Sequence, residues 1–158
     1  MSSARNLREV DHAEIITFVD EWWGGRHVSD KLPRLFFKYF RDTSFVLEED
    51  GRILAFLIGI IPKDSEEAYI HFVGIHPDHR KTGLAKRLYE TFLDEARDRE
   101  CKRVRCITSP VNKTSVSFHT GMGFEIEGGD GEVDGVSIHT NYDGDGKDKV
   151  LFVKKLSG

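Results

Sequence analysis

The chain has 158 residues, of which 39% are hydrophobic and 32% are charged, and its formal net charge is −4. This length and composition are typical of one globular domain, so we expect residues 1–158 to form a single domain. The negative charge gives no overall attraction to nucleic acid or an anionic membrane, and no apolar run approaches the ~20 residues of a spanning helix. Because the first residues also lack the apolar segment of a signal peptide, we expect a cytoplasmic protein.

In chain order, the apolar patterning predicts a strand at residues 6–10, a helix from residue 11 to the glycine pair at 24–25, and a second helix at about 30–40. Strands are expected at 44–47 and 53–61, joined around the hairpin signal Asp50-Gly51, and at 68–75. A helix at about 81–99, a strand at 104–108, a helix at 112–121 and strands at 124–127 and 150–154 complete the order. Residues 125–148 are rich in Gly and Asp, which indicates a turn-rich acidic connection.

The two cysteines, Cys101 and Cys106, are too far apart along one predicted strand to form a disulfide. At ~3.3 Å per residue their separation is about 16 Å. We therefore expect two free thiols, as in cytosolic proteins. Residues 141–146 imitate the opening of a calcium-binding EF-hand loop, but the twelfth position, which needs a bidentate Glu, is Phe152. The sequence predicts no metal site.

The stretch from residue 76 to residue 88 carries the most information about function. A predicted strand ends there, Pro77 closes a short turn, and the start of the following helix is rich in positive charge, with Arg80 and Lys81. A helix N-terminus already carries unpaired N–H groups and partial positive charge, so cations there are unfavourable unless an anion binds among them. Gly83 lets the backbone approach such a ligand closely. The pattern predicts a phosphate or pyrophosphate site; the alternative is a solvated basic helix start followed by a packing glycine.

Two motifs in this region resemble those of a known family. The sequence Arg80-Lys81-Thr82-Gly83-Leu84-Ala85 is similar to the Arg/Gln-x-x-Gly-x-Gly/Ala loop of the GNAT superfamily of N-acetyltransferases. The preceding Val73-Gly74-Ile75-His76-Pro77 resembles the end of that family's fourth strand. Residues 112–124 resemble its second signature, an Asn-led helix that ends in an aromatic pair followed by Gly-Phe. Together the resemblance covers residues 68–124 in the right order and spacing.

The resemblance implies an α/β (α+β) fold with a central mixed, mostly antiparallel seven-stranded sheet, about four flanking helices, and a cleft between strands 4 and 5. It implies an N-acetyltransferase that uses acetyl-CoA and passes the acetyl group directly to a primary amine of a small molecule or peptide. Neither nucleic acid nor membrane is expected as a partner, and the protein is expected to be a monomer or a homodimer. The alternative is a catalytically weak acyl-CoA-binding or regulatory module of the same fold.

The resemblance also implies how this chain holds CoA. The loop holds the pyrophosphate chiefly through backbone N–H groups, the strand before it pairs with the pantetheine arm, and a backbone N–H near Val73 contacts the thioester carbonyl. Asn112 and Ser115 contact the CoA arm, and Asn112 also caps its helix. The expected cofactor-binding residues are Val73, Gly74, Ile75, Arg80, Lys81, Thr82, Gly83, Leu84, Ala85, Lys86, Asn112, Ser115 and Phe118.

Two histidines are the expected catalytic residues. Strand alternation puts His71 on the same face as Tyr69 and Val73. In the similar arylalkylamine N-acetyltransferases a histidine on this strand is linked to proton removal from the amine, and an unperturbed pKa of ~6.5 suits that role. The alternatives are a packed strand histidine and a base that acts through water from Glu67. His119 stands where the family commonly has a tyrosine acid; it either returns a proton to the thiolate or is an exposed histidine without a role.

The connection after the first helix is the expected acceptor site, because in similar proteins this region covers the acceptor side of the cleft. Adjacent tryptophans on a helix point ~100° apart, so one of Trp22 and Trp23 should be core and the other should line a pocket. Arg26 is expected to pair with an acceptor carboxylate or phosphate, and a tryptophan face to hold the ammonium or a ring. The alternative is that both tryptophans are core and Arg26 is solvated.

Overall fold

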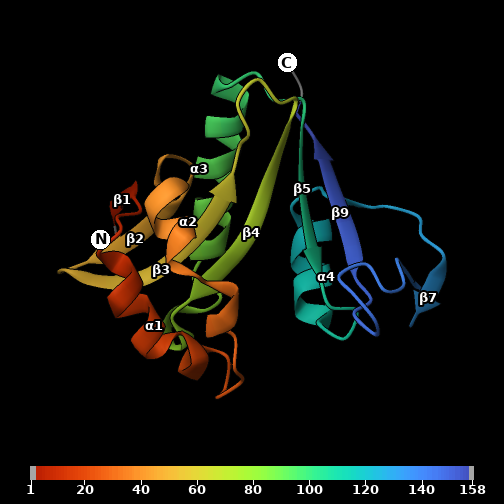
Figure 1. Cartoon of the computed structure of the whole chain (residues 1–158), viewed down its shortest axis with the longest axis horizontal. Coiled ribbons are helices and arrows are strands. Elements are labelled where there is room, and N and C mark those ends of the chain that lie inside the picture. The colour runs from red at the N-terminus through yellow and green to blue at the C-terminus, as the bar shows by residue number, and fades with distance from the viewer. Residues whose placement is uncertain (1–2, 157–158) are drawn as a thin grey trace.

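A seven-stranded sheet forms the centre of the protein, and a short hairpin stands apart from it (Figure 1). The computed structural model describes residues 3–156. All neighbouring strands of the sheet are antiparallel except β4 and β5, which are parallel, so the sheet is mixed and mostly antiparallel as expected. The strand order is β1 (Ser3–Asn6), β2 (Phe45–Glu49), β3 (Arg52–Ile60), β4 (Glu67–Ile75), β5 (Arg103–Thr108), β9 (Val150–Lys155) and β6 (Glu125–Ile126).

Helices cover both faces of this sheet. In the described part of the chain the α-helices are α1 (Asp11–Trp22), α2 (Arg34–Tyr39), α3 (Leu84–Asp98) and α4 (Lys113–Gly121). Short 3₁₀ turns are η1 (Ser29–Lys31), η2 (Arg41–Thr43) and η3 (Pro77–His79). The separate hairpin consists of β7 (Gly131–Val133) and β8 (Val136–Ile138). Among these helices none is both long enough and apolar enough to cross a membrane.

The two faces of the sheet bury two separate hydrophobic cores. On one face, Phe56 and Ile58 of β3 pack with α1 and α2, which lie in front of the sheet in Figure 1. On the other face, Ala55 and Leu57 pack with α3, around the fully buried Phe92. Because β3 is covered on both sides, its sequence reads as a continuous apolar run instead of an alternating one.

β4 contains a bulge at His71. Ile58 of β3 pairs with Phe72, but the next residue, Gly59, pairs with Ile70, so His71 is an extra residue in the ladder. Gly59 is fixed opposite the bulge by η2 and the following residue: its N–H donates to the Ser44 hydroxyl over 3.0 Å, and its carbonyl accepts from Thr43 over 2.6 Å. Hydrogen bonds from Thr43 and Ser44 therefore stabilise the register change.

The bulge changes which face the following side chains point to, because side chains alternate with a period of two. Ile70 and Val73, three residues apart, both pack against the α3-side core. His71 instead lies on the α1–α2 side, where its ring stacks on Phe36 with centroids 4.3 Å apart. The expectation that His71 shares a face with Val73 is therefore wrong, since it assumed an unbroken strand.

β4 and β5 lie side by side only where they begin. Residues 67–69 pair with residues 103–105, and the ladder then ends. Figure 1 shows the two strands separating toward their carboxyl ends. Helices α3 and α4 follow β4 and β5 in the chain, so both helices begin at this open end of the sheet. The expected separation of strands 4 and 5 is thus present, with two helix N-termini beside it.

Several element boundaries differ from the sequence expectation. β1 covers residues 3–6 instead of 6–10. Of residues 7–10 only Leu7 is buried, and its backbone N–H donates to the carbonyl of Ser44 over 3.0 Å. The helix expected at 30–40 is split, since Pro33 is extended, with ψ 151°, directly before α2. Residues 131–138 form a hairpin around Asp134-Gly135, where the sequence predicted only a turn-rich connection. Cys101 and Cys106 are free and buried, as predicted.

Replacing Gly59 with alanine should destabilise the fold at the bulge. A Cβ there would lie 2.1 Å from Cε1 of Phe92 and 2.5 Å from the carbonyl oxygen of Thr43. We expect Gly59→Ala to lower the free energy of unfolding by about 1–3 kcal/mol, measured by urea denaturation. Gly128→Ala is the control, because its Cβ would meet no atom within 4 Å. Equal stability of the two variants would contradict the close packing described above.

Candidate active site

The loop before α3 presents an unobstructed helix N-terminus. Gly83 occupies the N-cap position with φ 87°, and no side chain caps the helix there. A Cβ on Gly83 would meet nothing within 4 Å, so the space above the loop is open. The first turn of α3 contains no acidic residue. Since the first N–H groups of a helix lack intrahelical partners, this loop fits an anionic group such as a pyrophosphate.

The loop starts differently from the expectation. Lys81, with φ 63°, and Gly83 are both left-handed, so α3 begins at Leu84 and not at about residue 81. Lys81 and Thr82 are exposed on the loop, and Lys86 is exposed in the first turn of α3. Lys81 and Lys86 add positive charge around the open N-terminus, although the Lys86 ammonium also lies 3.9 Å from the Glu90 carboxylate and the Thr82 hydroxyl donates to the carbonyl of His79.

Arg80 has a contact that the sequence did not predict. Its guanidinium donates to the carbonyl oxygen of Trp22, the last residue of α1. The last turn of α1 has no basic residue of its own, so Arg80 supplies the positive charge that favours a helix C-terminus. In this structure the Arg80 side chain joins the loop to α1, while its backbone remains part of the loop.

The open edge of β4 is the second part of the site. Residues 70–75 have no ladder partner on β5 in the described structure, so this edge can pair with an extended ligand. Packing explains the glycine at position 74, because a Cβ there would lie 2.5 Å from Cε1 of Phe56. Val73 and Ile75 are half-buried against the α3-side core. The edge is thus rigidly supported from behind.

Helix α4 contributes its N-terminus and one aromatic ring. The Asn112 side chain accepts a hydrogen bond from the backbone N–H of Ser115 over 3.1 Å, which confirms Asn112 as the helix cap. The Ser115 hydroxyl is half-buried, 3.2 Å from Nδ1 of His119. Phe118 is half-buried with its ring edge-on to Tyr89 at 5.0 Å. Asn112 is therefore exposed beside the open end of the sheet, whereas Phe118 lies against the core.

His71 is held in one orientation and one tautomer. Its Nε2 lies 2.7 Å from the carbonyl oxygen of Lys31 in η1. Because that oxygen can only accept, Nε2 carries the proton and Nδ1 has a free lone pair. Desolvation lowers the pKa of His71 below its usual value, and the bond to Lys31 opposes this only in part. His71 is therefore a neutral imidazole at pH 7 whose Nδ1 can accept a proton.

Glu67 is poorly suited to be the base. Arg103 donates to its carboxylate over 3.0 Å and Arg105 over 2.6 Å. Burial alone would raise the pKa of Glu67, but these two arginines outweigh it and the pKa lies below its usual value. A carboxylate that already accepts from two guanidinium groups is a weak proton acceptor, so the geometry favours His71 over Glu67.

His119 is a core residue, contrary to the expectation of an exposed histidine. It is 6% exposed and stacks on Phe152 with ring centroids 4.6 Å apart. Its Nδ1 donates to the carbonyl of Ser115 over 2.7 Å, and its Nε2 accepts from the Tyr89 hydroxyl over 2.8 Å. Burial lowers the pKa of His119, partly opposed by the Ser115 bond. A role for His119 in protonating a thiolate stays a prediction, and none of these contacts supports it.

The two tryptophans after Glu21 differ in environment. Trp22 is 5% exposed and stacks on Phe18 at 4.3 Å, so it is a core residue and its predicted contact with substrate is corrected. Trp23 is half-buried with its ring 4.9 Å from Phe72. Arg26 is exposed. Of the predicted acceptor-side residues, Trp23 and Arg26 keep surfaces that a ligand can reach.

The segment that carries Arg26 is shaped by Asp20. The Asp20 carboxylate accepts from the backbone N–H groups of Val28 over 2.8 Å and Ser29 over 2.9 Å. The bond from Val28 is the chief reason that the pKa of Asp20 lies below its usual value. His27 bridges Asp20, at 3.3 Å, and Asp30, at 2.8 Å. These contacts fix the path of the chain from the end of α1 into η1.

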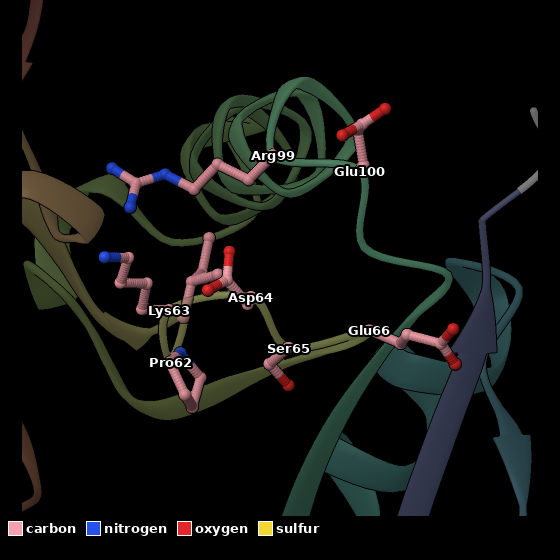
Figure 2. Close-up of a pocket in the computed structure, with 8 residues that line it drawn as sticks. Pro62, Lys63, Asp64, Ser65, Glu66, Arg99 and Glu100 are labelled. Atoms are coloured by element: carbon pink, nitrogen blue, oxygen red, sulfur yellow. The ribbon is translucent and has the colours of Figure 1, made fainter.

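A hollow in the described structure lies away from these residues. It has a volume of about 420 Å³ and sits between the β3–β4 turn and the end of α3, the opposite end of α3 from Gly83 (Figure 2). Charged side chains such as Lys63, Glu66 and Arg99 line it, and none of the predicted site residues does. Within residues 3–156 no group of three His, Cys, Asp or Glu side chains is arranged to hold a metal ion.

Sequence reasoning missed three features of the site. The sequence does not indicate the pairing of Tyr89 with His119, because the two residues are 30 positions apart. Lys31 was not singled out because its contribution to His71 comes from a backbone carbonyl. Residues 141–149 were treated as a plain connection, although Lys31 and Tyr69 interact electrostatically with several of them.

Tyr89→Phe should destabilise the fold, because it removes the hydroxyl that donates to a buried ring nitrogen of His119. We expect the free energy of unfolding to fall by about 1–3 kcal/mol in urea denaturation, the cost of an unsatisfied buried acceptor. Tyr39→Phe is the matched control, since Tyr39 is 69% exposed. If Tyr89→Phe is as stable as Tyr39→Phe, the buried pair is not held as described.

The amino-acid sequence and the fold of this chain are both similar to those of known proteins. Residues 11–124 match the model of a family that is described as "Acetyltransferase (GNAT) family". An L-2,4-diaminobutyric acid acetyltransferase of Wolinella succinogenes is 32% identical over 89 residues, which are 54% of this chain and 51% of that protein. This chain spans about half the length, or less, of the curated relatives that it matches.

Solved structures share the fold over nearly the whole chain. Ard1 from Thermoplasma volcanium has a TM-score of 0.79 at 18% identity, covering 99% of both chains. The Salmonella typhimurium protein yncA, solved with its cofactor acetyl-CoA, has a TM-score of 0.70 at 17% identity, covering 99% of this chain and 94% of that one. Together with the match over residues 11–124, the fold identifies this chain as a member of the GNAT family of acetyltransferases.

Proposed function

We propose that this chain is an N-acetyltransferase that moves an acetyl group from acetyl-CoA directly to a primary amine. The observation that carries the proposal is the open end of the sheet, where the unpaired edge of β4 and the uncapped N-terminus of α3 lie together. The edge of β4 fits an extended arm with amide groups, and the N-terminus of α3 fits a pyrophosphate. That combination matches the shape and charge of CoA.

Different residues of this chain would bind different parts of CoA. The backbone of residues 80–86 would bind the pyrophosphate, with Lys81 and Lys86 adding positive charge. The edge at Val73, Gly74 and Ile75 would pair with the pantetheine arm. Asn112, at the exposed N-terminus of α4, would contact the same arm from the β5 side.

His71 is the proposed base. It takes the proton that the amine must lose, at Nδ1, while Nε2 stays bonded to Lys31. Acetyl-CoA supplies a thioester whose carbonyl carbon bonds to the amine nitrogen as the carbon–sulfur bond breaks and its electron pair leaves with sulfur. A backbone N–H near Val73 would donate to the carbonyl oxygen as that oxygen gains negative charge.

The bulge would determine the side of β4 from which the amine and the acetyl donor each reach the site. His71 lies on the α1–α2 side of β4, whereas Val73 packs toward α3. The amine would therefore reach the open edge from the α1–α2 side, where Trp23 and Arg26 are accessible, and the donor from the α3–α4 side. This supports direct transfer, because no nucleophilic side chain has to carry the acetyl group between the two.

A second candidate is an acyl-CoA-binding or regulatory module that has lost turnover. The engagement of both His119 nitrogens favours it, because His119 stands where the family commonly has a tyrosine acid. For either function we propose a cytoplasmic protein, in keeping with the free thiols of Cys101 and Cys106, that acts as a monomer or homodimer on a small-molecule or peptide amine.

Release of free thiol from acetyl-CoA with a panel of primary amines tests the proposal. The wild-type protein should turn over, with kcat/KM rising with pH through an apparent pKa below the usual 6.5 of histidine, because the neutral form of His71 is favoured by burial. His71→Gln should lower kcat by about 10²–10⁴-fold, remove that pH dependence and leave the Kd of acetyl-CoA unchanged.

His12→Gln is the matched control for this experiment. The Nε2 of His12 also contacts a backbone carbonyl, that of Leu32, over 3.0 Å, and its ring packs on Phe37. It should therefore keep wild-type turnover and pH dependence. Binding of acetyl-CoA without turnover of any amine would favour the regulatory module, and an unchanged pH profile in His71→Gln would assign the base to another group.

A further inference from the structure

The carbonyl that orients His71 belongs to a single turn of the chain. Nε2 of His71 lies 2.7 Å from the carbonyl oxygen of Lys31, the last residue of η1. This turn is closed by backbone hydrogen bonds from Lys31 to Val28 and from Leu32 to Ser29, each over 3.0 Å. The direction of the Lys31 carbonyl therefore depends on how the start of η1 is held.

The start of η1 is held by a side chain of α1. Val28 occupies the N-cap position of η1, and its own side chain makes no cap hydrogen bond. Instead, Oδ1 of Asp20, in the last turn of α1, accepts from the backbone N–H groups of Val28 over 2.8 Å and Ser29 over 2.9 Å. The first N–H groups of a helical turn have no partner within the turn. One oxygen of Asp20 thus supplies the partner that both of them need.

The second oxygen of Asp20 has different partners. Oδ2 lies 3.3 Å from Nδ1 of His27 and accepts from the Ser29 hydroxyl over 3.3 Å. His27 also contacts the Asp30 carboxylate over 2.8 Å, and its side chain is 66% exposed, so solvent screens the charges of this group. An amide at position 20 would keep an acceptor for the two N–H groups and lose the negative charge. The two kinds of contact can therefore be separated by substitution.

Stacking alone does not choose the tautomer of His71. The ring of Phe36, with its centroid 4.3 Å from that of the imidazole, constrains the plane of the ring but is neutral toward which nitrogen carries the proton. The Lys31 carbonyl makes that choice, because it can only accept a hydrogen bond. A continuous set of hydrogen bonds thus leads from Asp20, through η1, to the proposed base.

We propose that Asp20 is a positioning residue for acetyl transfer, which holds η1 so that the Lys31 carbonyl keeps the proton of His71 on Nε2 and leaves Nδ1 free for the amine. This inference rests on the proposed transferase function and adds a residue that acts through Lys31 and not on the substrate. Without the Asp20 acceptor, the N–H groups of Val28 and Ser29 lose their partner, and the turn that carries Lys31 loosens. The imidazole then loses its fixed bond, and the proton is shared between its two nitrogens.

The kinetic test compares Asp20→Ala with Asp20→Asn by thiol release from acetyl-CoA. Asp20→Ala should lower kcat by about 10–10²-fold, as expected for a misplaced reacting group, and leave the Kd of acetyl-CoA unchanged. Asp20→Asn should recover most of that loss, because its amide oxygen can accept from both N–H groups. Glu21→Ala is the matched control, since it removes an exposed carboxylate from the same turn of α1.

The pH profile distinguishes positioning from a general loss of structure. Burial lowers the pKa of His71, and the bond to the Lys31 carbonyl raises it by more than the Lys31 charge lowers it. Loss of that bond in Asp20→Ala should therefore move the apparent pKa of kcat/KM to lower pH, whereas Asp20→Asn and Glu21→Ala should keep the wild-type value. His27 also titrates and faces Asp20, so His27→Gln is measured in parallel and should keep the wild-type value as well.

The ¹⁵N chemical shifts of the His71 ring give a readout that needs no turnover. We expect the wild-type protein and Asp20→Asn to show one tautomer, with the proton on Nε2, and Asp20→Ala to show a mixture of both. If Asp20→Ala does not fold, Asp20→Glu takes its place, because the longer side chain keeps the charge but displaces the acceptor. The same mixture and the same shift of the apparent pKa are then expected.

Three results would overturn the inference. One is an unchanged tautomer and pH profile in Asp20→Ala, even if the acceptor KM rises, because Asp20 would then shape only the acceptor side. Another is the same loss in His27→Gln as in Asp20→Ala, which would assign the effect to the ion pair. The third is a defect in Asp20→Asn equal to that of Asp20→Ala. If no amine is acetylated, the transferase proposal fails, and the ring spectra alone decide whether Asp20 positions His71.

Discussion

The separation of β4 from β5 is the constraint on which the rest of the site depends. β4 pairs with β3 along most of its length but with β5 only over residues 67–69. Backbone groups in the interior of a sheet are ordinarily paired. The open edge of an inner strand can therefore form backbone hydrogen bonds with another extended chain. The helices that follow β4 and β5 both begin at this open end, which adds two positive helix termini to one exposed edge.

The bulge at His71 uses the same strand for a second purpose. By adding one residue, it turns His71 toward α2 and η1 while Val73 stays on the α3 side. A regular strand would put both side chains on one face, and the base would then compete with the CoA arm for space. The hydrogen bond from His71 to Lys31 ties this geometry to η1, so the path of the chain after α1 helps to define the base.

The sequence predicted the sheet, the loop and the helix cap because these depend on local signals. Gly83 and Asn112 sit at helix termini, where a glycine or a capping side chain has a specific conformational reason. The hairpin at Asp134-Gly135 had the same kind of signal between Val133 and Val136, and it was overlooked among other Gly and Asp residues.

Features that depend on contacts distant in sequence could not be predicted in this way. A bulge is visible only in the register between two strands, so the face of His71 was assigned wrongly. The burial of His119 depends on Tyr89 and Phe152, which lie on other elements. The contact between Arg80 and Trp22 joins residues 58 positions apart. Side-chain partners of this kind follow from tertiary packing and not from residue type or spacing.

The central claim is that the open edge of β4 and the first turn of α3 together hold CoA. Amide chemical shifts of ¹⁵N-labelled protein, recorded while CoA is added, test it most directly. The account predicts that the largest changes occur at residues 72–75 and 80–86, with little change around the hollow at 61–66. Shift changes concentrated at 61–66 and 99–100, or none at 72–75, would contradict it.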